Sequence, residues 1–308
     1  MFSIWLMMYD VVKHRMLVEL VGFDDNFDVI PMEQWFILGC MQIDGEERKV
    51  LDFHKDARKE DVDVYFGLPR YTNSTFRSPT TNEVYFFLRD KYVRVYYTPG
   101  QVTQTNDKFL TDLGWIGYGF PSFQYNIFGS YGIFSSFDTE GNEAYISRDY
   151  VCSYIDYAND KILSGPIRIE LMFSILEGTM FKDGIDSTFR SSKGKEVYLF
   201  HGNKYCCMDY DSKQLVEPIC NITDGYPILK GTIFEDRIDA SFVSHNENQA
   251  YLFKEENYVL MNFTPGSTDD TLVDIVKSIV DGWSCFKGIL PLEDRQADYT
   301  SDEFDFEE

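Results

Sequence analysis

The chain has 308 residues, of which 44% are hydrophobic and 17% aromatic, a composition typical of a well-packed globular protein. Its formal net charge of −23 argues against nucleic acid or an anionic membrane as a partner and favours cationic ligands such as metal ions or polyamines. The six cysteines include no CxxC pair and no zinc-type spacing with histidine, so we expect them to be reduced, small apolar residues. Because no transmembrane run and no signal-peptide pattern are evident, we expect a cytoplasmic protein.

Residues 1–66 do not share the pattern of the rest of the chain. The segment 34–41 is apolar and could form a short strand or helix, whereas 48–63 is strongly charged. Two interpretations are open: a small appended module, or an extension that is poorly ordered and absent from the mature protein. We favour the second, because no other element is evident that would bury the apolar segment.

Four later segments share one pattern: an apolar run, a short turn and a second apolar run that ends on an aromatic residue. They are 82–97, 142–157, 193–210 and 248–263. Such a pattern predicts a β-hairpin. Upstream of each hairpin a phenylalanine follows a small polar residue, with spacings of 61, 52 and 53 residues: Phe76, Phe137, Phe189 and Phe242. A period near fifty with several strands per unit is typical of a propeller or solenoid, and four copies indicate a closed ring.

Each unit is expected to form one blade, at about 67–126, 127–178, 179–231 and 232–292. In the first unit we predict an innermost strand at 73–77, followed by strands at 82–88 and 92–97. The strand at 84–88 is apolar on both faces, as is the one at 197–200, which indicates that neighbouring sheets cover both faces.

A more helical stretch follows each hairpin and is clearest at 268–280. Its apolar residues fall at i, i+3, i+4 and i+7: Leu272, Ile275, Val276 and Ile279. Thr268 is the predicted N-cap and Gly282 the predicted end of this helix. The acidic tail, 294–308, is expected to be a solvated coil.

These units resemble hemopexin repeats. The marks are a strand of small residues that ends in Phe, as in DSTFR at 186–190 and DASF at 239–242, and the hairpin that follows it. Across about 68–293 the chain is most similar to the legume seed albumins of hemopexin fold, the albumin 2 type, through segments such as NEVYFFLRDKYVRVYYTPG and GIDSTFRSSKGKEVYLF. The resemblance implies an all-β, four-bladed β-propeller with ions in a central channel. It also implies soluble seed proteins that bind polyamine (spermine) and haem and have storage or stress-related roles.

The resemblance places calcium, with sodium and chloride as further candidates, in the channel. The ligating positions that it implies stand at the entrances of the innermost strands: Asn73, Phe134, Asp186 and Asp239. Backbone carbonyls there would form a square of hard oxygen ligands that suits Ca²⁺. Phe134 departs from the usual Asp, which weakens the local negative field. The alternative is that the Asp and Asn side chains cap turns by accepting hydrogen bonds from nearby N–H groups.

Haem would need an axial ligand, for which His201 in a hairpin turn and His245 in a loop are the candidates. Polyamine binding fits the negative charge and the many tyrosines, since ammonium groups favour carboxylates and aromatic faces. Glu83, Glu143 and Glu196 stand at equivalent repeat positions, with Gln249 in the fourth. They are either a ring of ligands or ordinary rim residues.

The sequence contains no phosphate-binding glycine loop, no HExxH and no Gly-x-Ser-x-Gly motif, so we predict that the protein is not an enzyme. The favoured reading is a non-catalytic ligand-binding protein with channel cations that binds polyamine or haem. The alternative is a seed storage albumin whose ions are purely structural. A homodimer is left open.

Overall fold

The computed structural model describes β1 (Ile4–Asp10), β2 (Arg15–Val21) and residues 71–292. The chain divides into two compact units, Met1–Pro69 and Arg70–Glu308. In the first unit β1 and β2 pair antiparallel, a hairpin that the sequence analysis did not predict. The apolar segment 34–41 and the acidic tail 294–308 lie outside the described residues, and the poor order expected of residues 1–66 stays a prediction.

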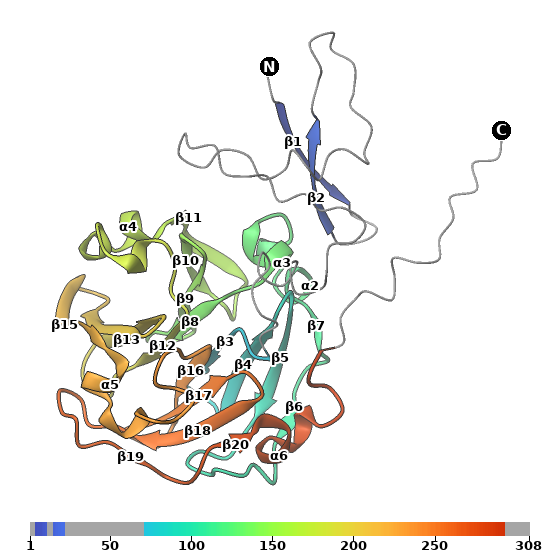
Figure 1. Ribbon diagram of the computed structural model, residues 1–308. Helices are drawn as coiled ribbons and strands as arrows, with labels where there is room; N and C mark the ends of the chain where they lie inside the picture. Colours follow the sequence, from blue (N-terminus) through green and yellow to red (C-terminus); the bar gives the residue numbers. More distant parts are fainter. Residues whose placement is uncertain (1–3, 11–14, 22–70, 293–308) are drawn as a thin grey trace, which may run out of the picture. The chain divides into compact units, whose positions relative to one another are not determined.

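Residues 71–292 form four antiparallel sheets, one for each repeat, with the strands in chain order from the inside outward (Figure 1). Blade 1 contains β3 (Ser74–Arg77), β4 (Glu83–Leu88), β5 (Lys91–Tyr96), β6 (Lys108–Phe109) and β7 (Gly114–Trp115). Blade 2 contains β8 (Ser135–Asp138), β9 (Glu143–Arg148), β10 (Val151–Asp156) and β11 (Lys161–Arg168). Blade 3 contains β12 (Ser187–Arg190), β13 (Glu196–His201), β14 (Lys204–Asp209) and β15 (Gln214–Asn221). Blade 4 contains β16 (Ala240–Val243), β17 (Gln249–Lys254), β18 (Asn257–Asn262), β19 (Thr271–Leu272) and β20 (Lys277–Ser278).

The four innermost strands close a ring about one axis. β3 contacts β8 and β16, and β12 contacts the same two strands, so that each inner strand has two inner neighbours (Figure 1). Hydroxyl groups link them: Ser74 Oγ lies 2.5 Å from Ser136 Oγ, and Ser187 Oγ lies 2.5 Å from Ser241 Oγ. The predicted four-bladed propeller is therefore confirmed.

Each inner strand presents its anchor phenylalanine to the interface with the next blade. Phe76 stacks on Tyr85 of its own blade at 4.6 Å between ring centroids and lies 5.1 Å from Tyr157 of blade 2. Phe242 repeats this contact with Tyr251 at 4.9 Å. All four anchors are buried, and burial of one such side chain stabilises the fold by about 1.5–3 kcal/mol. The sheets are thus covered on both faces by their neighbours, as their apolar strands predict.

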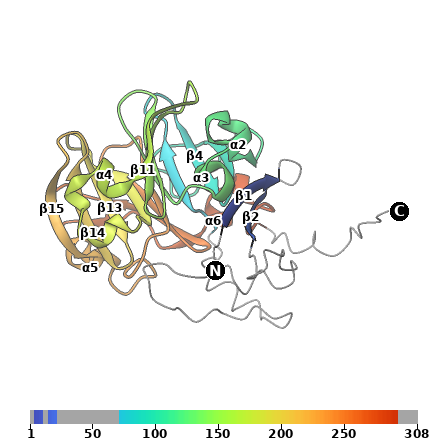
Figure 2. The ribbon, with the colours of Figure 1, turned by 90° about the horizontal axis from the view of Figure 1, so that it is seen from above.

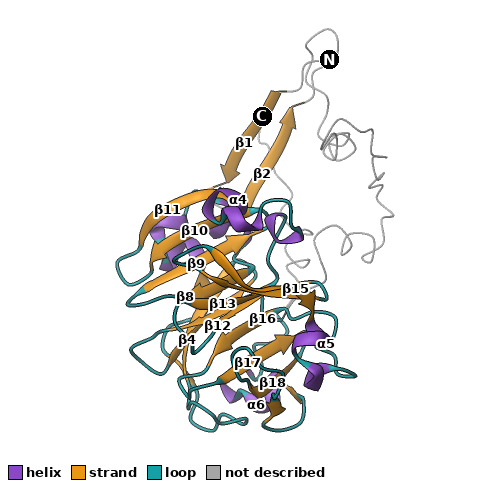
Figure 3. Ribbon diagram, turned by 90° about the vertical axis from the view of Figure 1, so that its left-hand side faces the viewer, coloured by secondary structure: helices purple, strands orange, loops and turns teal. Residues whose placement is uncertain are grey.

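A four-residue helix follows the outer strand of every blade. These helices are α2 (Ile116–Gly119), α4 (Ile169–Met172), α5 (Ile222–Gly225) and α6 (Ile279–Gly282). Short 3-10 turns follow them at Pro121–Phe123, Ser174–Leu176, Met180–Lys182, Pro227–Leu229 and Ser284–Phe286, and blade 1 adds α3 (Ile127–Tyr131). α4 contacts β11 and α5 contacts β15, at the outer side of their blades (Figures 2 and 3). No helix within residues 71–292 has the length and apolar character to cross a membrane.

The helix predicted at 268–280 is wrong over most of its length. The segment instead supplies the outer edge of blade 4, β19 and β20, which pair with β18, and only α6 is helical. Leu272 and Val276 pack against the core between blades 3 and 4, while Ile275 is 71% exposed, so no continuous helical face is buried. The edge of β18 offers unpaired backbone groups that the segment satisfies as a strand. Gly282 does end the helix, as predicted.

A loop of blade 1 completes the ring by crossing onto blade 4. Gln104 N–H donates to the carbonyl of Gly282 at 2.7 Å. Asp107 accepts from Ser284 Oγ at 2.5 Å and from the Cys285 N–H at 2.9 Å. Tyr251 of blade 4 donates to the carbonyl of Gln101 at 2.7 Å. Hydrogen bonds between the first and last blades therefore close the propeller.

Candidate functional site

The four positions predicted to ligate a channel cation occupy equivalent places. Each directly precedes an inner strand, and its N–H donates to a carbonyl of the second strand of its blade. The bonds are Asn73 to Phe87 at 2.9 Å, Phe134 to Ser147 at 2.9 Å, Asp186 to Phe200 at 2.8 Å and Asp239 to Phe253 at 2.9 Å. The fourfold repeat of one backbone geometry brings these residues to the same end of the ring, here called the channel mouth.

The side chains at the channel mouth cap turns. Asn73 Oδ1 accepts from the Arg89 N–H at 2.6 Å, and the carboxylates of Asp186 and Asp239 accept equivalent bonds at 2.7 and 2.9 Å from Gly202 and Glu255. Each donor is the first residue of a tight turn, with φ of 57°, 52° and 52°. Within residues 71–292 no group of three or more His, Cys, Asp or Glu side chains could hold a metal ion. A channel cation would therefore depend on the backbone carbonyls.

Blade 2 is different, because Phe134 replaces the capping oxygen with a ring. The guanidinium of Arg148 lies over this ring, 4.1 Å from its centroid, and 5.2 Å from the centroid of Tyr131. Arg237 adds a second positive charge at the mouth, with its Nε 2.7 Å from Asp239 Oδ1. The negative field that would attract a cation is consequently weaker than four acids would make it.

At the opposite end of the inner strands lies a charge cluster that the sequence analysis missed. Asp138 Oδ2 is 3.4 Å from Arg77 Nε and 3.8 Å from a guanidinium nitrogen of Arg190. Burial raises the pKa of Asp138, and the two arginines oppose that rise. The three residues end the inner strands β3, β8 and β12, which belong to three different blades. Only closure of the ring therefore brings their side chains together.

The glutamates at equivalent repeat positions are not brought together as a ring of ligands. Each stands at the start of a second strand, one strand away from the axis, and interacts within its own blade. Glu83 pairs with Arg94, Glu143 accepts from Tyr154, Glu196 lies 3.6 Å from Lys193, and Gln249 donates to Asn262 at 2.9 Å. Of the four, Glu143 lines a pocket.

The two candidate haem ligands lie in different blades, His201 level with the start of an inner strand and His245 just past the end of one. His201 is the last residue of β13, with its ring 6.2 Å from that of Phe181. His245 follows β16 and has both ring nitrogens in hydrogen bonds, Nδ1 to Tyr97 Oη at 2.7 Å and Nε2 to the carbonyl of Ser78 at 2.6 Å. Burial lowers the pKa of His245, which favours the neutral ring. The structure therefore offers neither a shared haem site nor an available nitrogen on His245.

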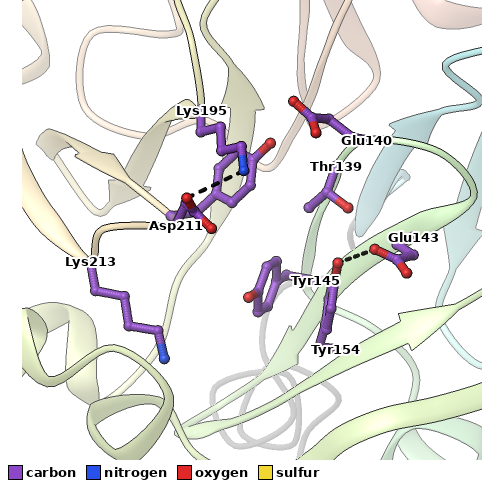
Figure 4. Close-up of a pocket in the computed structure, with 9 residues that line it drawn as sticks. Thr139, Glu140, Glu143, Tyr145, Tyr154, Lys195, Asp211 and Lys213 are labelled. Atoms are coloured by element: carbon purple, nitrogen blue, oxygen red, sulfur yellow. Dashed lines mark hydrogen bonds and ion pairs between the residues drawn. The ribbon is translucent and has the colours of Figure 1, made fainter.

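A pocket of about 310 Å³ lies between blades 2 and 3 (Figure 4). Blade 2 contributes Glu143 and Tyr145 from β9 and Tyr154 from β10, and Lys195 and Asp211 of blade 3 face them across the opening. Glu140 and Lys213 also line it, so three carboxylates stand against two ammonium groups. Because its two walls are about fifty residues apart in the chain, sequence reasoning did not find this pocket.

The walls of the pocket are ordered by contacts among its own residues. Tyr154 donates a hydrogen bond to Glu143, and the rings of Tyr145 and Tyr154 stack with centroids 4.4 Å apart. Lys195 Nζ lies 3.3 Å from Asp211 Oδ2 on the other wall. Burial raises the pKa of Tyr145 to about 12. The pocket thus combines a carboxylate, aromatic faces and a net negative charge, a combination that suits a cationic group.

In blade 1 the same combination of a glutamate and a tyrosine holds a cation that belongs to the protein itself. Tyr85 pairs across the sheet with Arg94, just as Tyr145 pairs with Tyr154. Arg94 Nε lies 3.1 Å from the carboxylate of Glu83, and its guanidinium carbon lies 5.6 Å from the ring centroid of Tyr85. In blade 2 the residue equivalent to Arg94 is a tyrosine, which leaves the glutamate and tyrosine without an internal cation at this position.

The fold defines the class of protein: a four-bladed β-propeller of the hemopexin type. No family model matches the chain. Albumin-2 of Pisum sativum is 45% identical over 228 residues, which cover 72% of this chain and 97% of that protein. A hemopexin-fold protein of cow pea, CP4, is 53% identical and covers 72% of this chain and 100% of its own, with a TM-score of 0.69. A plant lectin with two metal-binding sites from Cicer arietinum is 50% identical with the same coverage and TM-score.

The chain therefore belongs to the albumin-2 family of legume seed albumins. The resemblance that the repeats carry is confirmed, as is the hemopexin fold. These relatives are named as seed albumins and lectins, and none of the names indicates catalysis.

Proposed function

We propose that this seed albumin is a non-catalytic binding protein that takes a polyamine in the pocket between blades 2 and 3. One ammonium group of the ligand pairs with Glu143 and lies over the rings of Tyr145 and Tyr154. The observation that carries the proposal is the equivalent site in blade 1, where the cation of Arg94 lies between Glu83 and Tyr85. A cation over an aromatic ring contributes about 0.5–2 kcal/mol, and the carboxylate adds a charge-assisted hydrogen bond.

The second wall of the pocket extends the site for a long ligand. Asp211 on that wall, which also pairs with Lys195, and Glu140 of blade 2 supply further carboxylates, so that a chain with several ammonium groups meets more than one of them. The net charge of −23 concentrates polycations near the surface at low ionic strength. Haem is not part of the proposal, because the contacts of His201 and His245 give it no support.

The proposal includes a calcium ion at the channel mouth, held by the backbone carbonyls of Asn73, Phe134, Asp186 and Asp239. Its support is the equivalent backbone geometry of the four positions and the hard oxygen donors that Ca²⁺ prefers. The related lectin from Cicer arietinum is described as having two metal-binding sites. A bound cation at this position would tie the entrances of the four inner strands together.

Isothermal titration with spermine at low salt tests the polyamine site. We expect the unmodified protein to bind, and Glu143→Gln to weaken binding by roughly 10-fold or more, because a charge-assisted hydrogen bond contributes about 1.5–3 kcal/mol. The matched control is Glu196→Gln, the equivalent residue of blade 3, which does not line the pocket and should bind like the unmodified protein. A flat titration of the unmodified protein would refute the proposal and leave the storage function as the better account.

A further inference from the structure

Two loops of the propeller are equivalent residue for residue. Thr98-Pro99-Gly100 in blade 1 recurs as Thr264-Pro265-Gly266 in blade 4, and six residues after each threonine stands a side chain that folds back onto it: Gln104 and Asp270. The Thr98 N–H donates to Gln104 Oε1 at 2.8 Å, and the Thr264 N–H donates to Asp270 Oδ1 at 3.0 Å. The two side chains therefore hold their loops in the same way through one oxygen.

The nitrogen of the Gln104 amide shows which kind of hydrogen bond this position in the loop requires. Its Nε2 donates to the carbonyls of Thr98 at 3.1 Å and Gln101 at 2.8 Å, and lies 3.2 Å from the hydroxyl of Tyr251 in the neighbouring blade. Gln104 is 1% exposed, so these bonds replace those that water would make. An N–H donor is what this position in the loop requires.

Asp270 places an oxygen where Gln104 has its NH₂ group. Asp270 is 7% exposed, and its Oδ2 is buried without a hydrogen-bond partner within residues 71–292. The turn is the same as in blade 1, since the Ser267 N–H bonds to the Thr264 carbonyl at 2.9 Å, as Gln101 bonds to Thr98. By this equivalence the position of Oδ2 calls for a donor, and a carboxyl oxygen donates only when it carries a proton.

The groups that face Asp270 also disfavour its ionised form. Glu217 on β15 of blade 3 and the adjacent Asp269 are both negative. The hydroxyl of Tyr226 in blade 3, buried without a partner in the described part of the chain, is the neutral group on this side. Glu217 accepts from the hydroxyl of Tyr205 at 3.1 Å. Burial raises the pKa of Asp270 to about 6, with further rises from Asp269 and Glu217, while the Thr264 N–H lowers it.

We propose that Asp270 is a protonation-dependent latch at the interface of blades 3 and 4. The neutral carboxyl donates from Oδ2 and holds loop 264–270 against blade 3, as Gln104 holds loop 98–104 against blade 4. The ionised carboxylate loses that donor and faces Glu217 with like charge. Because the pKa is higher in the folded than in the unfolded chain, the folded state binds the extra proton. The stabilisation is therefore present at acid pH, declines as the pH rises from about 4 to about 6, and is absent above that range.

Thermal unfolding of the full chain and of Asp270→Asn at pH 4.5 and pH 7.5 tests the latch. The amide of the variant donates at both pH values, so we expect its Tm to exceed that of the unmodified protein by several degrees at pH 7.5 and to match it closely at pH 4.5. Asp112→Asn, at an exposed acid of blade 1 that does not act on Asp270, is the control and should show no such pH-dependent difference. The reciprocal variant Gln104→Glu replaces the amide donor with a carboxyl group. We expect its Tm to fall below that of the unmodified protein at pH 7.5.

Two results would overturn the proposal. A Tm difference between the unmodified protein and Asp270→Asn that is equal at both pH values would show that no proton is involved. A calcium-induced rise in Tm at pH 7.5 that Asp270→Asn abolishes would show that a cation, rather than a proton, neutralises the carboxylate. Hydrogen exchange of the 264–270 amides gives a local readout: protection must fall from pH 4.5 to pH 7.5, relative to intrinsic rates, in the unmodified protein and not in the variant.

Discussion

At the channel mouth, one position decides how strongly each blade attracts a cation. Asn73, Asp186 and Asp239 accept the N–H of a turn residue, while Phe134 packs its ring beneath Arg148. The backbone geometry is the same in all four blades, so the difference is one of charge and of turn capping. Blade 2 is consequently the weak side of the proposed cation site.

Phe134→Asp should strengthen that side. The new carboxylate stands where Asp186 and Asp239 accept a turn N–H, and it adds a negative charge at the mouth, so we expect calcium to bind several-fold more tightly. Titration calorimetry with calcium measures the change, with Phe134→Leu as a control that removes the ring without adding charge. An affinity unchanged in Phe134→Asp would contradict the placement of the cation at the mouth.

At the level of elements, each four-residue helix packs against its sheet through two residues of complementary size. One is the last residue of the helix, and the other lies on the third strand of the blade. In three blades the helix ends in a glycine that lies against a tyrosine of the third strand, and a Cβ there would overlap the tyrosine. The pairs are Gly119 with Tyr92, Gly225 with Tyr205 and Gly282 with Tyr258. In blade 2 both sizes are reversed: Met172 ends α4, and Cys152 takes the place of the tyrosine, in one core cluster. The departure at Cys152 is thus a packing exchange.

Exchanging one pair tests this fit. We expect Gly225→Met to cost about 1–3 kcal/mol through overpacking and Tyr205→Cys to cost about 2–4 kcal/mol through the cavity it leaves. The double variant restores the pattern of blade 2 and should lose less than the sum of the two, because the methionine fills the space of the ring. Urea unfolding of the single and double variants measures the coupling, and additive losses would refute it.

At the scale of the whole molecule, a loop joins the first and last blades within residues 71–292. The loop after β5 reaches blade 4 and ends on Asp107, which accepts from Ser284 and Cys285. Tyr251 and Tyr258 of blade 4 donate to the same loop, to the carbonyls of Gln101 and Val102. These contacts join the two ends of the described propeller and oppose its opening.

Asp107→Ala should therefore weaken the closure. The loss of two hydrogen bonds to a charged group leads us to expect a decrease of about 2–4 kcal/mol in the free energy of unfolding, with increased hydrogen exchange in the loop after β5 and in α6. Asp112→Ala, which alters an exposed acid in the same blade, is the control. Equal stability of the two variants would mean that the Asp107 contacts do not hold the ring closed.

Most of the propeller was predictable, whereas the sites were predictable only in part. The anchors Phe76, Phe137, Phe189 and Phe242 and their hairpins recur at nearly constant spacing, so the blades could be counted directly. The apolar spacing at 268–280 predicted a helix, but the segment forms two short edge strands, β19 and β20, because the edge of β18 lies beside it. The equivalent glutamates were recognised, but their partners, such as Arg94 and Tyr154, follow from strand register.

The sequence by itself determined the number of blades and the inner strands. These features are repeated locally, and each copy carries the same short-range signals for strand and turn. Only the tertiary structure decided that Glu143 and Asp211 share a pocket, that Asp107 closes the ring, and that Asp270 meets Glu217. Contacts of this kind join residues of different elements or blades, and their energy depends on burial and distance, which exist only once the chain has folded.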